Sequence, residues 1–135
     1  MNIKTTKRDK NMKNEHYEQY LSLVETVFHA RASSIIDNSK NKRVYVEFNS
    51  IDSVIGGLTI VESDKGIGSI MYMCVEPNCR SKGIGGKLLQ QLHEDFKGLI
   101  TLRTRNAESF YLKHGYKTIG DNGQHKFMIK YNELF

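Results

Sequence analysis

Residues 73–88 have the sequence MCVEPNCRSKGIGGKL, which joins an apolar run to a predicted helix. The only proline of the chain, Pro77, ends the apolar run, and three glycines stand where the helix begins. A helix N-terminus presents unpaired N–H groups and partial positive charge, so it binds phosphate-like anions. Gly83, Gly85 and Gly86 remove side chains that would keep a ligand from those N–H groups. The stretch is therefore predicted to bind a diphosphate, with added positive charge from Arg80, Lys82 and Lys87.

Two common nucleotide-binding motifs do not fit this stretch. The dinucleotide-binding pattern G-x-G-x-x-G, counted from Gly83, requires a glycine where Leu88 stands. The phosphate-binding loop of P-loop proteins, placed on Gly86-Lys87, requires glycine at Ser81 and Ser or Thr at Leu88. The spacing therefore excludes both of these nucleotide motifs.

The flanking sequence predicts a mixed α/β (α+β) domain. Apolar residues at three- and four-residue steps predict helices over 14–30, 83–97 and 107–114, with a short helix and loop within 31–42. Alternation and apolar runs predict strands over 2–6, 43–48, 54–61, 69–75, 99–104, 116–119 and 125–131. Gly56-Gly57 is expected to interrupt the third strand. The fourth is almost continuously apolar, as in a strand covered on both faces.

Two motifs resemble those of the GNAT superfamily of acyl-CoA-dependent N-acetyltransferases. Residues 80–85, RSKGIG, match the family's acyl-CoA signature, which is Arg or Gln, two residues, Gly, one residue, and Gly or Ala. Residues 107–116, AESFYLKHGY, match a second motif, which is Ala, two residues, Phe or Leu, Tyr, three residues, Gly, and Phe or Tyr. The preceding Val75-Glu76-Pro77 resembles the usual lead-in from the fourth strand.

The resemblance implies a mostly antiparallel twisted sheet with helices on both faces and a splay between strands four and five. It covers nearly the whole chain, taken as one domain over 1–135, and is firmest over 70–116. Acetyl-CoA is the implied acyl-donor substrate, with its pantetheine arm lying in the splay like an added strand. The implied cofactor-binding residues are Met73, Cys74, Val75, Arg80, Ser81, Lys82, Gly83, Ile84, Gly85 and Gly86.

The resemblance also implies a mechanism in which a neutral amine attacks the thioester. Backbone N–H groups at a strand bulge around Cys74 and Val75 would stabilise the oxyanion. Tyr111 occupies the position that donates a proton to the departing thiolate in many relatives. Relatives often carry a cofactor-contacting Asn where Thr104 stands, and Asn106 follows two residues later. The general base is left open among Glu47, Glu62 and Glu76.

Three interpretations of function are carried forward. A small primary amine is the first expected acceptor, and a protein lysine or N-terminus is the second. The fifth strand offers Arg103 and no carboxylate, which disfavours a protein N-terminal acetyltransferase. A non-catalytic acyl-CoA-binding regulatory module would bind the donor without turnover. A basic nucleic-acid-binding protein would lose salt-sensitive binding on removal of residues 1–13.

Composition narrows the class further. Residues 1–13 carry five basic and one acidic side chain, a net charge of +4, so the formal +5 is mostly a property of this segment. The rest is nearly neutral, and nucleic acid is not the expected partner. No apolar run is long enough to cross a membrane. Cys74 and Cys79 fit a reducing, cytoplasmic location, and Arg80 and Lys82 were reasons to expect a lowered pKa at Cys79. No metal is predicted, and a homodimer is a further expectation.

Overall fold

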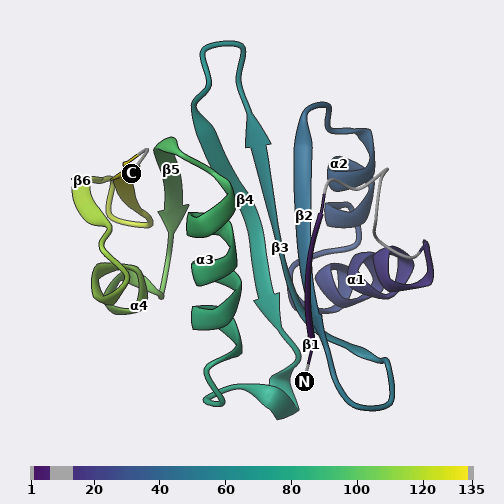
Figure 1. The fold of residues 1–135 in the computed structure, drawn as a ribbon. Coiled ribbons are helices and arrows are strands. Elements are labelled where there is room, and N and C mark those ends of the chain that lie inside the picture. Colours follow the sequence, from purple (N-terminus) through teal and green to yellow (C-terminus); the bar gives the residue numbers. More distant parts are fainter. Residues whose placement is uncertain (1, 7–13, 134–135) are drawn as a thin grey trace.

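The computed structural model describes residues 2–6 and 14–133. Its elements, shown in Figure 1, are β1 (Asn2–Thr6), α1 (Asn14–Val27), α2 (Ala32–Asn38), β2 (Lys42–Phe48), β3 (Val54–Glu62), β4 (Gly68–Val75), the 3-10 turn η1 (Pro77–Cys79), α3 (Ile84–Asp95), β5 (Gly98–Thr104), α4 (Glu108–Lys113), β6 (Lys117–Asp121) and β7 (Lys126–Asn132). Every predicted strand and helix is present. The basic residues at 7–13 lie outside the described part of the chain.

One seven-stranded sheet organises the molecule, in the order β1-β2-β3-β4-β5-β7-β6. Every neighbouring pair is antiparallel except β4 and β5, which are parallel. Because parallel neighbours need a crossover connection, α3 links β4 to β5 across one face of the sheet (Figure 1). The prediction of a mixed, mostly antiparallel sheet is confirmed.

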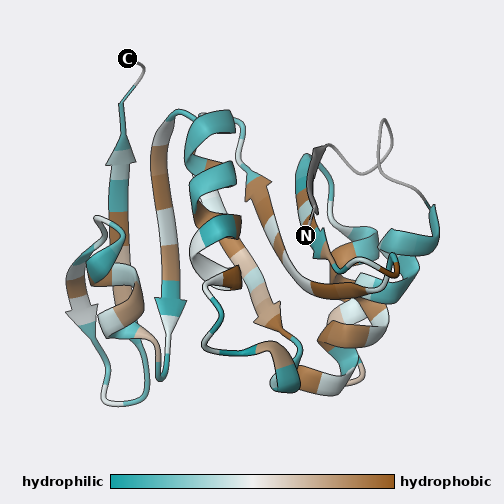
Figure 2. Ribbon diagram, turned by 60° about the horizontal axis from the view of Figure 1, so that its bottom comes forward, coloured by the Kyte–Doolittle hydropathy of each residue, from teal (hydrophilic) through white to brown (hydrophobic). Residues whose placement is uncertain are grey.

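Helices cover both faces of the sheet and define two hydrophobic clusters. The apolar stripe of α3, which includes Leu88 and Leu92, packs with Tyr45, Ile60 and Ile100 on one face. On the opposite face, α1 and α2 pack Tyr20, Val24 and Ile36 against Val44 and Val46 of β2. Figure 2 shows the corresponding hydrophobic positions along the central strands and the inner faces of the helices. The expectation of helices on both faces is therefore confirmed.

Strand β3 is continuous through Gly56-Gly57, so the expected interruption was wrong. A Cβ atom at Gly57 would lie 2.3 Å from the Tyr20 ring of α1, and one at Gly56 would lie 2.9 Å from Ile84 of α3. The two glycines thus let helices on opposite faces approach the sheet closely. The Tyr20 hydroxyl reaches across to the Thr59 hydroxyl at 2.5 Å.

Helix α1 ends at Val27, three residues before the predicted end. Phe28 leaves the apolar stripe, is 43% exposed, and packs edge-to-face on Tyr72 of β4 with ring centroids 5.0 Å apart. The sequence pattern counted Phe28 as part of the helix because its spacing continues the stripe. Its contact with β4 instead places the Phe28 side chain outside the hydrophobic cluster under α1.

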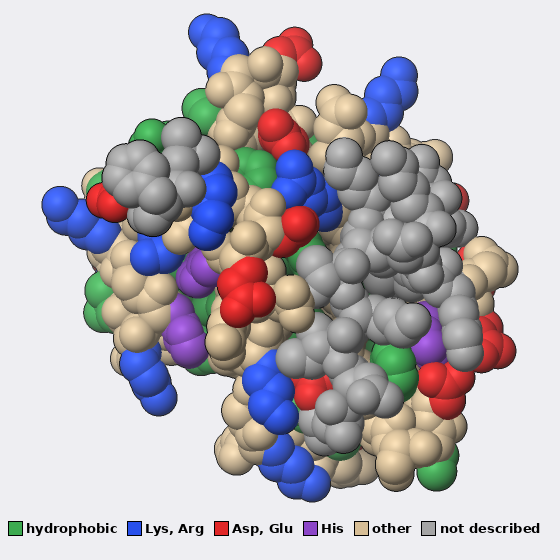
Figure 3. All heavy atoms as spheres, viewed as in Figure 1, with side chains coloured by type: hydrophobic (Ala, Val, Ile, Leu, Met, Phe, Trp, Pro, Cys, Tyr) green, Lys and Arg blue, Asp and Glu red, His purple; other side chains and the backbone are tan. Residues whose placement is uncertain are grey.

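Charge on the described surface is mixed. On the face that carries α3, Figure 3 shows Lys and Arg side chains interspersed with Asp and Glu. In the described part of the chain, no helix combines the length and the apolar character needed to span a lipid bilayer.

Candidate functional site

The parallel pair β4–β5 opens into a cleft. Only two residue pairs hold the strands together, Gly68 with Ile100 and Ser69 with Thr101, and the Ser69 and Thr101 hydroxyls lie 3.0 Å apart. Beyond Ser69 the strands separate while β4 stays paired with β3. The expected splay is therefore present, and it opens onto a cleft of about 1550 Å³.

The edge of β4 in this cleft is bent by a β-bulge at Met71. Thr59 and Ile60 are adjacent on β3, yet they pair with Tyr72 and Ile70 and leave Met71 as the extra residue. The bulge was expected around Cys74 and Val75, and that placement was wrong. Since a bulge shifts the side-chain alternation, Ile70 faces the α3 cluster, whereas Tyr72 and Cys74 face α1.

Strand β4 is also less covered than its sequence suggested. Met71 is 43% exposed, and Tyr72, Met73 and Val75 are only partly buried. An apolar run is indistinguishable in sequence from a strand buried by protein on both faces. Here the uncovered apolar surface lines the cleft instead.

The segment from Arg80 to Gly86, called the loop wall below, forms one side of the cleft. Ser81 and Gly83 both have left-handed backbone, with φ of 67° and 78°. For Ser81 this conformation is costly and marks a locally constrained backbone. A Cβ at Gly83 would meet nothing within 4 Å, so its surroundings are open. Alternating left- and right-handed residues before a helix turn successive N–H groups toward an anion.

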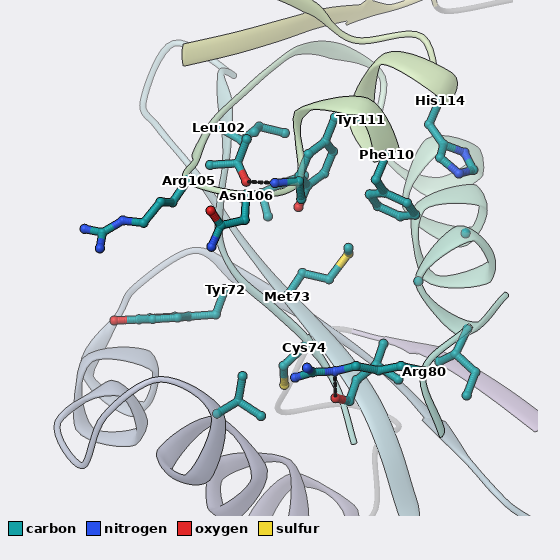
Figure 4. Close-up of a pocket in the computed structure, with 18 of the residues that line it drawn as sticks. Tyr72, Met73, Cys74, Arg80, Leu102, Arg105, Asn106, Phe110, Tyr111 and His114 are labelled. Carbon is teal, nitrogen blue, oxygen red and sulfur yellow. Dashed lines mark hydrogen bonds between the residues drawn. The ribbon is translucent and has the colours of Figure 1, made fainter. Parts of the chain in front are cut away.

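Residues before the loop wall hold it in place. The Glu76 carboxylate accepts a 2.9 Å hydrogen bond from the backbone N–H of Asn78, and the Glu76 N–H donates to Ile55 at 2.8 Å. Arg80 Nε donates to the carbonyl of Val75 at 3.3 Å, across the end of β4 (Figure 4). The guanidinium is thereby kept beside the start of α3.

Gly85 and Gly86 line the cleft and also stand where the chain approaches α4 closely. A Cβ at Gly85 would lie 3.1 Å from the Phe110 ring, and one at Gly86 would lie 3.3 Å from His114. Phe110 lies on α4 and His114 directly follows it, and their rings pack at a tilt with centroids 4.8 Å apart. In the described structure these glycines therefore permit close approach of α4 to α3.

Helix α4 carries the Tyr111 side chain to the cleft (Figure 4). The residue is 7% exposed, and burial raises the pKa of its phenol to about 12. Its ring packs edge-on against Phe110 and Tyr116, at centroid distances of 5.1 and 5.5 Å. Packing thus fixes the ring and keeps its hydroxyl protonated at neutral pH.

The turn before α4 separates the parts played by Thr104 and Asn106. The Thr104 hydroxyl accepts a 3.0 Å hydrogen bond from the Ala107 N–H, so it supports the turn. Asn106 is exposed, and its carboxamide lies at the cleft (Figure 4). The structure therefore presents the Asn106 carboxamide at the cleft, whereas the Thr104 hydroxyl is engaged in the turn.

The predicted cofactor-binding residues gather in one place with one exception, whereas the candidate bases do not. Nine of the ten predicted cofactor-binding residues line the cleft together with Tyr111, whereas Lys82 is exposed and outside the lining. None of the three candidate bases lines the described cleft. Glu47 is buried under α3, Glu62 pairs with Arg43 at 3.2 Å, and Glu76 braces the loop.

The two cysteines line the same cleft but differ in burial. Cys74 is buried, as predicted, and burial raises its pKa to about 12. Loss of hydration and the neighbouring Glu76 raise the pKa of Cys79, and Lys82 opposes them only in part. The expectation that Arg80 and Lys82 would lower the Cys79 pKa was therefore wrong.

The side of the cleft opposite the loop wall was not predicted. It is lined by Phe28 and His29 after α1, Tyr72 of β4, and Arg103 and Arg105 at the end of β5. These five residues are called the side-chain wall. They come from three separate segments and form no motif, so only the fold brings them together.

A separate cluster of metal-ligating types lies outside this cleft. Ligand atoms of Glu15, His16 and Asp52 lie within 4.8 Å of one another, and His16 Nε2 is 2.8 Å from Asp52 Oδ1. His16 is fully buried and stacks on Phe48. This ion-pair and ring packing explains its position at the edge of the α1 cluster.

The fold is that of an acyltransferase of the acetyltransferase class. A family model described as an acetyltransferase (GNAT) domain matches residues 40–118. The chain belongs to the GNAT acetyltransferase family.

Solved structures agree on the fold. An aminoglycoside 6'-acetyltransferase type Ii shares 18% identity, with 100% of this chain and 99% of that one covered and a TM-score of 0.81. GCN5 of Tetrahymena shares 12% identity over 100% and 98%, with a TM-score of 0.82. An aminoglycoside 6'-N-acetyltransferase complexed with coenzyme A shares 16% over 96% of each chain, with a TM-score of 0.79. No curated protein sequence matches the chain.

Proposed function

We propose that this protein transfers an acetyl group from acetyl-CoA to a primary amine by direct attack in a ternary complex. The proposal rests on the separation of β4 from β5 beyond Ser69. The gap between the strands ends at the loop wall, whose left-handed residues turn backbone N–H groups toward an anion. One strand edge and one helix start therefore face the same cleft. A related structure holding coenzyme A supports this choice of donor.

The chain offers the donor two kinds of backbone contact. One edge of β4 pairs with β3, and the opposite edge has no partner on β5 at Met73, Cys74 and Val75. A pantetheine amide would pair with this edge as an added strand does. The N–H groups from Ser81 to Gly86 would hold the pyrophosphate, and Arg80 would add charge to them. Lys82 would contribute from the rim of the cleft.

In the reaction, the amine nitrogen forms a bond to the acetyl carbon and the carbon–sulfur bond breaks. The nitrogen loses one proton, and the thiolate gains one. Tyr111 is the proposed proton donor to sulfur, since its buried phenol stays protonated at neutral pH and lies at the cleft. Backbone N–H groups of β4 between the Met71 bulge and Val75 would stabilise the oxyanion. Holding the two reactants together would supply most of the rate gain.

The described lining has no carboxylate to act as base. We infer that the reactive amine arrives neutral or loses its proton to water or to His29 at the cleft. The acceptor is not carried over from the aminoglycoside enzymes, because likeness at 16–18% identity shows the fold alone.

The test is a pair of measurements on purified protein. Thermal-shift and calorimetric titration with acetyl-CoA, against ATP and NAD as controls, measures donor binding. Saturating donor at 100 times its dissociation constant adds about 2.7 kcal/mol of stability. Thiol release with an amine panel then measures transfer. Donor binding without transfer to any amine would contradict catalysis and favour an acyl-CoA-binding regulatory module.

A further inference from the structure

The residues that line the cleft include many positive groups, so the cleft has an unbalanced charge. Among the described residues that line the cleft, none is Asp or Glu. Positive or ionisable nitrogen groups are numerous in that lining and come from Arg80, Arg103, Arg105, Lys113, His29, His114 and His125. An anionic donor accounts for some of this charge. It does not by itself account for charge on the wall opposite the loop.

Arg103 and Arg105 lie on that opposite side. Leu102 belongs to the α3 cluster, so alternation along β5 points Arg103 to the other face, where α1 packs. Figure 4 shows Arg105 and Tyr72 extending to the same side of the view, opposite Phe110 and His114. Both guanidiniums therefore stand apart from Arg80 and the start of α3.

Neither guanidinium is neutralised by a residue that the structure describes. Within residues 14–133, the ion pairs of arginine side chains involve Arg43 alone, with Glu62 and Asp95 at 3.2 Å. Arg103 and Arg105 are exposed and have no hydrogen-bond or ion-pair partner among those residues. Two unpaired guanidiniums in one cleft create a positive field that attracts anions and repels cations.

The remainder of the side-chain wall is aromatic. Tyr72 packs edge-on with Phe28 at 5.0 Å and with His29 at 6.3 Å between ring centroids. These rings offer a contact surface for the carbon skeleton of a small molecule. The wall thus combines an apolar platform with two donors suited to a carboxylate.

We propose that the acceptor is a small amine that also carries a carboxylate, such as an amino acid. The assignment rests on the proposed function and narrows its acceptor. Arg103 and Arg105 would bind the carboxylate, for which the guanidinium fork is the best protein donor. The side-chain wall would then direct the amine toward the gap between β4 and β5. Polyamines and other polycations would meet unpaired positive charge with no described carboxylate to offset it.

The experiment uses matched acceptors with saturating acetyl-CoA. Amino acids are compared with the amines left after removal of the carboxylate, for example lysine with cadaverine and ornithine with putrescine. Products are measured by mass spectrometry and rates by thiol release. We expect kcat/KM to favour the carboxylate member by at least about tenfold, the size of one charge-assisted contact. Equal or better transfer to the decarboxylated amines or to an aminoglycoside would overturn the proposal while leaving acetyl transfer established.

Variants separate the acceptor from the donor phosphates. Arg103→Gln and Arg105→Gln should raise KM for the carboxylate acceptor about tenfold or more and leave the acetyl-CoA Kd within about twofold. Arg103→Lys should restore part of the effect, and Lys65→Gln, in the exposed β3–β4 turn, should change neither constant. An acetyl-CoA Kd that weakens as much as the acceptor KM would overturn the proposal by assigning both guanidiniums to the donor. Failure of every amine to react would instead contradict acetyl transfer itself.

Discussion

The loop wall and the side-chain wall face the same cleft but are built from different parts of the chain. The loop wall is mainly backbone, with left-handed Ser81 and Gly83 leading into α3. The side-chain wall takes Phe28, Tyr72 and Arg103 from three distant segments. A backbone site requires a few fixed residue types at fixed spacing, so it is visible as a motif. A side-chain site can change its residues freely, and this is where acceptor choice would be encoded.

The largest expected effect breaks the loop wall with one carboxylate. Gly83→Glu puts negative charge at the proposed pyrophosphate site, and we expect the acetyl-CoA Kd to weaken by at least about 100-fold. The measurement is calorimetric titration. Gly66→Glu is the matched control, since Gly66 has φ of 82° and, like Gly83, nothing within 4 Å of its Cβ position. Both variants bear the same backbone strain, so equal acetyl-CoA affinities would remove the phosphate site from the loop wall.

The next effect concerns the Tyr111 hydroxyl between the walls. Tyr111→Phe should lower kcat by about 100-fold and leave the acetyl-CoA Kd nearly unchanged, because only proton donation is lost. Tyr116→Phe is the control. Its hydroxyl lies 2.8 Å from His93 Nε2, so its loss should cost about 1 kcal/mol of stability without a change in kcat. Equal turnover by Tyr111→Phe and the wild type would exclude this residue from the mechanism.

The same phenol predicts the alkaline limb of the pH profile. Burial raises the Tyr111 pKa to about 12, so the phenol keeps its proton well beyond the pH at which a solvent-exposed tyrosine loses it. We therefore expect kcat to show no Tyr111-dependent fall between pH 7 and about pH 10. A fall in wild-type kcat near pH 9 that disappears in Tyr111→Phe would contradict the assigned pKa and the burial that causes it.

The fold and the loop wall were predictable because short-range rules determine them. The α3 stripe and the helix start after Pro77 both rest on local spacing. The bulge was predicted around Cys74 and Val75 and lies at Met71. The position of a bulge depends on how β4 aligns with β3, which no single segment specifies. For the same reason, nothing in the sequence indicated that Gly85 and Gly86 also lie against Phe110 and His114.

The side-chain wall could not be predicted because its members meet only in the folded protein. Phe28 matched the helix periodicity, and nothing local indicated its contact with Tyr72. The three glutamates proposed as bases were selected by residue type alone. In the folded protein, their neighbours indicate structural roles. Arg43, for example, forms an ion pair with Glu62.

A smaller effect sharpens the division of charge between the walls. Arg80→Gln should weaken the acetyl-CoA Kd by about tenfold, or about 1.4 kcal/mol, by removing one charge-assisted contact. Its salt dependence should also decrease, since screening acts on the lost charge. Arg31→Gln, an exposed arginine before α2, is the control. An unchanged Kd would limit Arg80 to its hydrogen bond with the Val75 carbonyl.

The smallest expected effect concerns Glu47, a buried residue under α3, the helix that begins in the loop wall. The Glu47 carboxylate is fully buried, and neither of its oxygens has a hydrogen-bond partner among the residues that the structure describes. Its nearest described cation is Lys87 Nζ of α3, at 4.0 Å. Burial raises the pKa of Glu47, with Lys87 partly opposing it. The folded state therefore binds this proton more tightly than the unfolded state, and stability falls as pH rises from the ordinary glutamate value through the folded-state value.

Glu47→Gln removes that buried charge and keeps the shape of the side chain. We expect the free energy of unfolding to rise at pH 8, because the buried charge is removed, with no gain at pH 4. Denaturant titrations at both pH values measure this difference. The acetyl-CoA Kd should stay the same, because the proposed donor contacts of the loop wall are backbone N–H groups that have no hydrogen bond to Glu47. A weaker Kd at unchanged stability would instead mean that the Glu47 charge, acting through Lys87, helps set the loop wall for the donor.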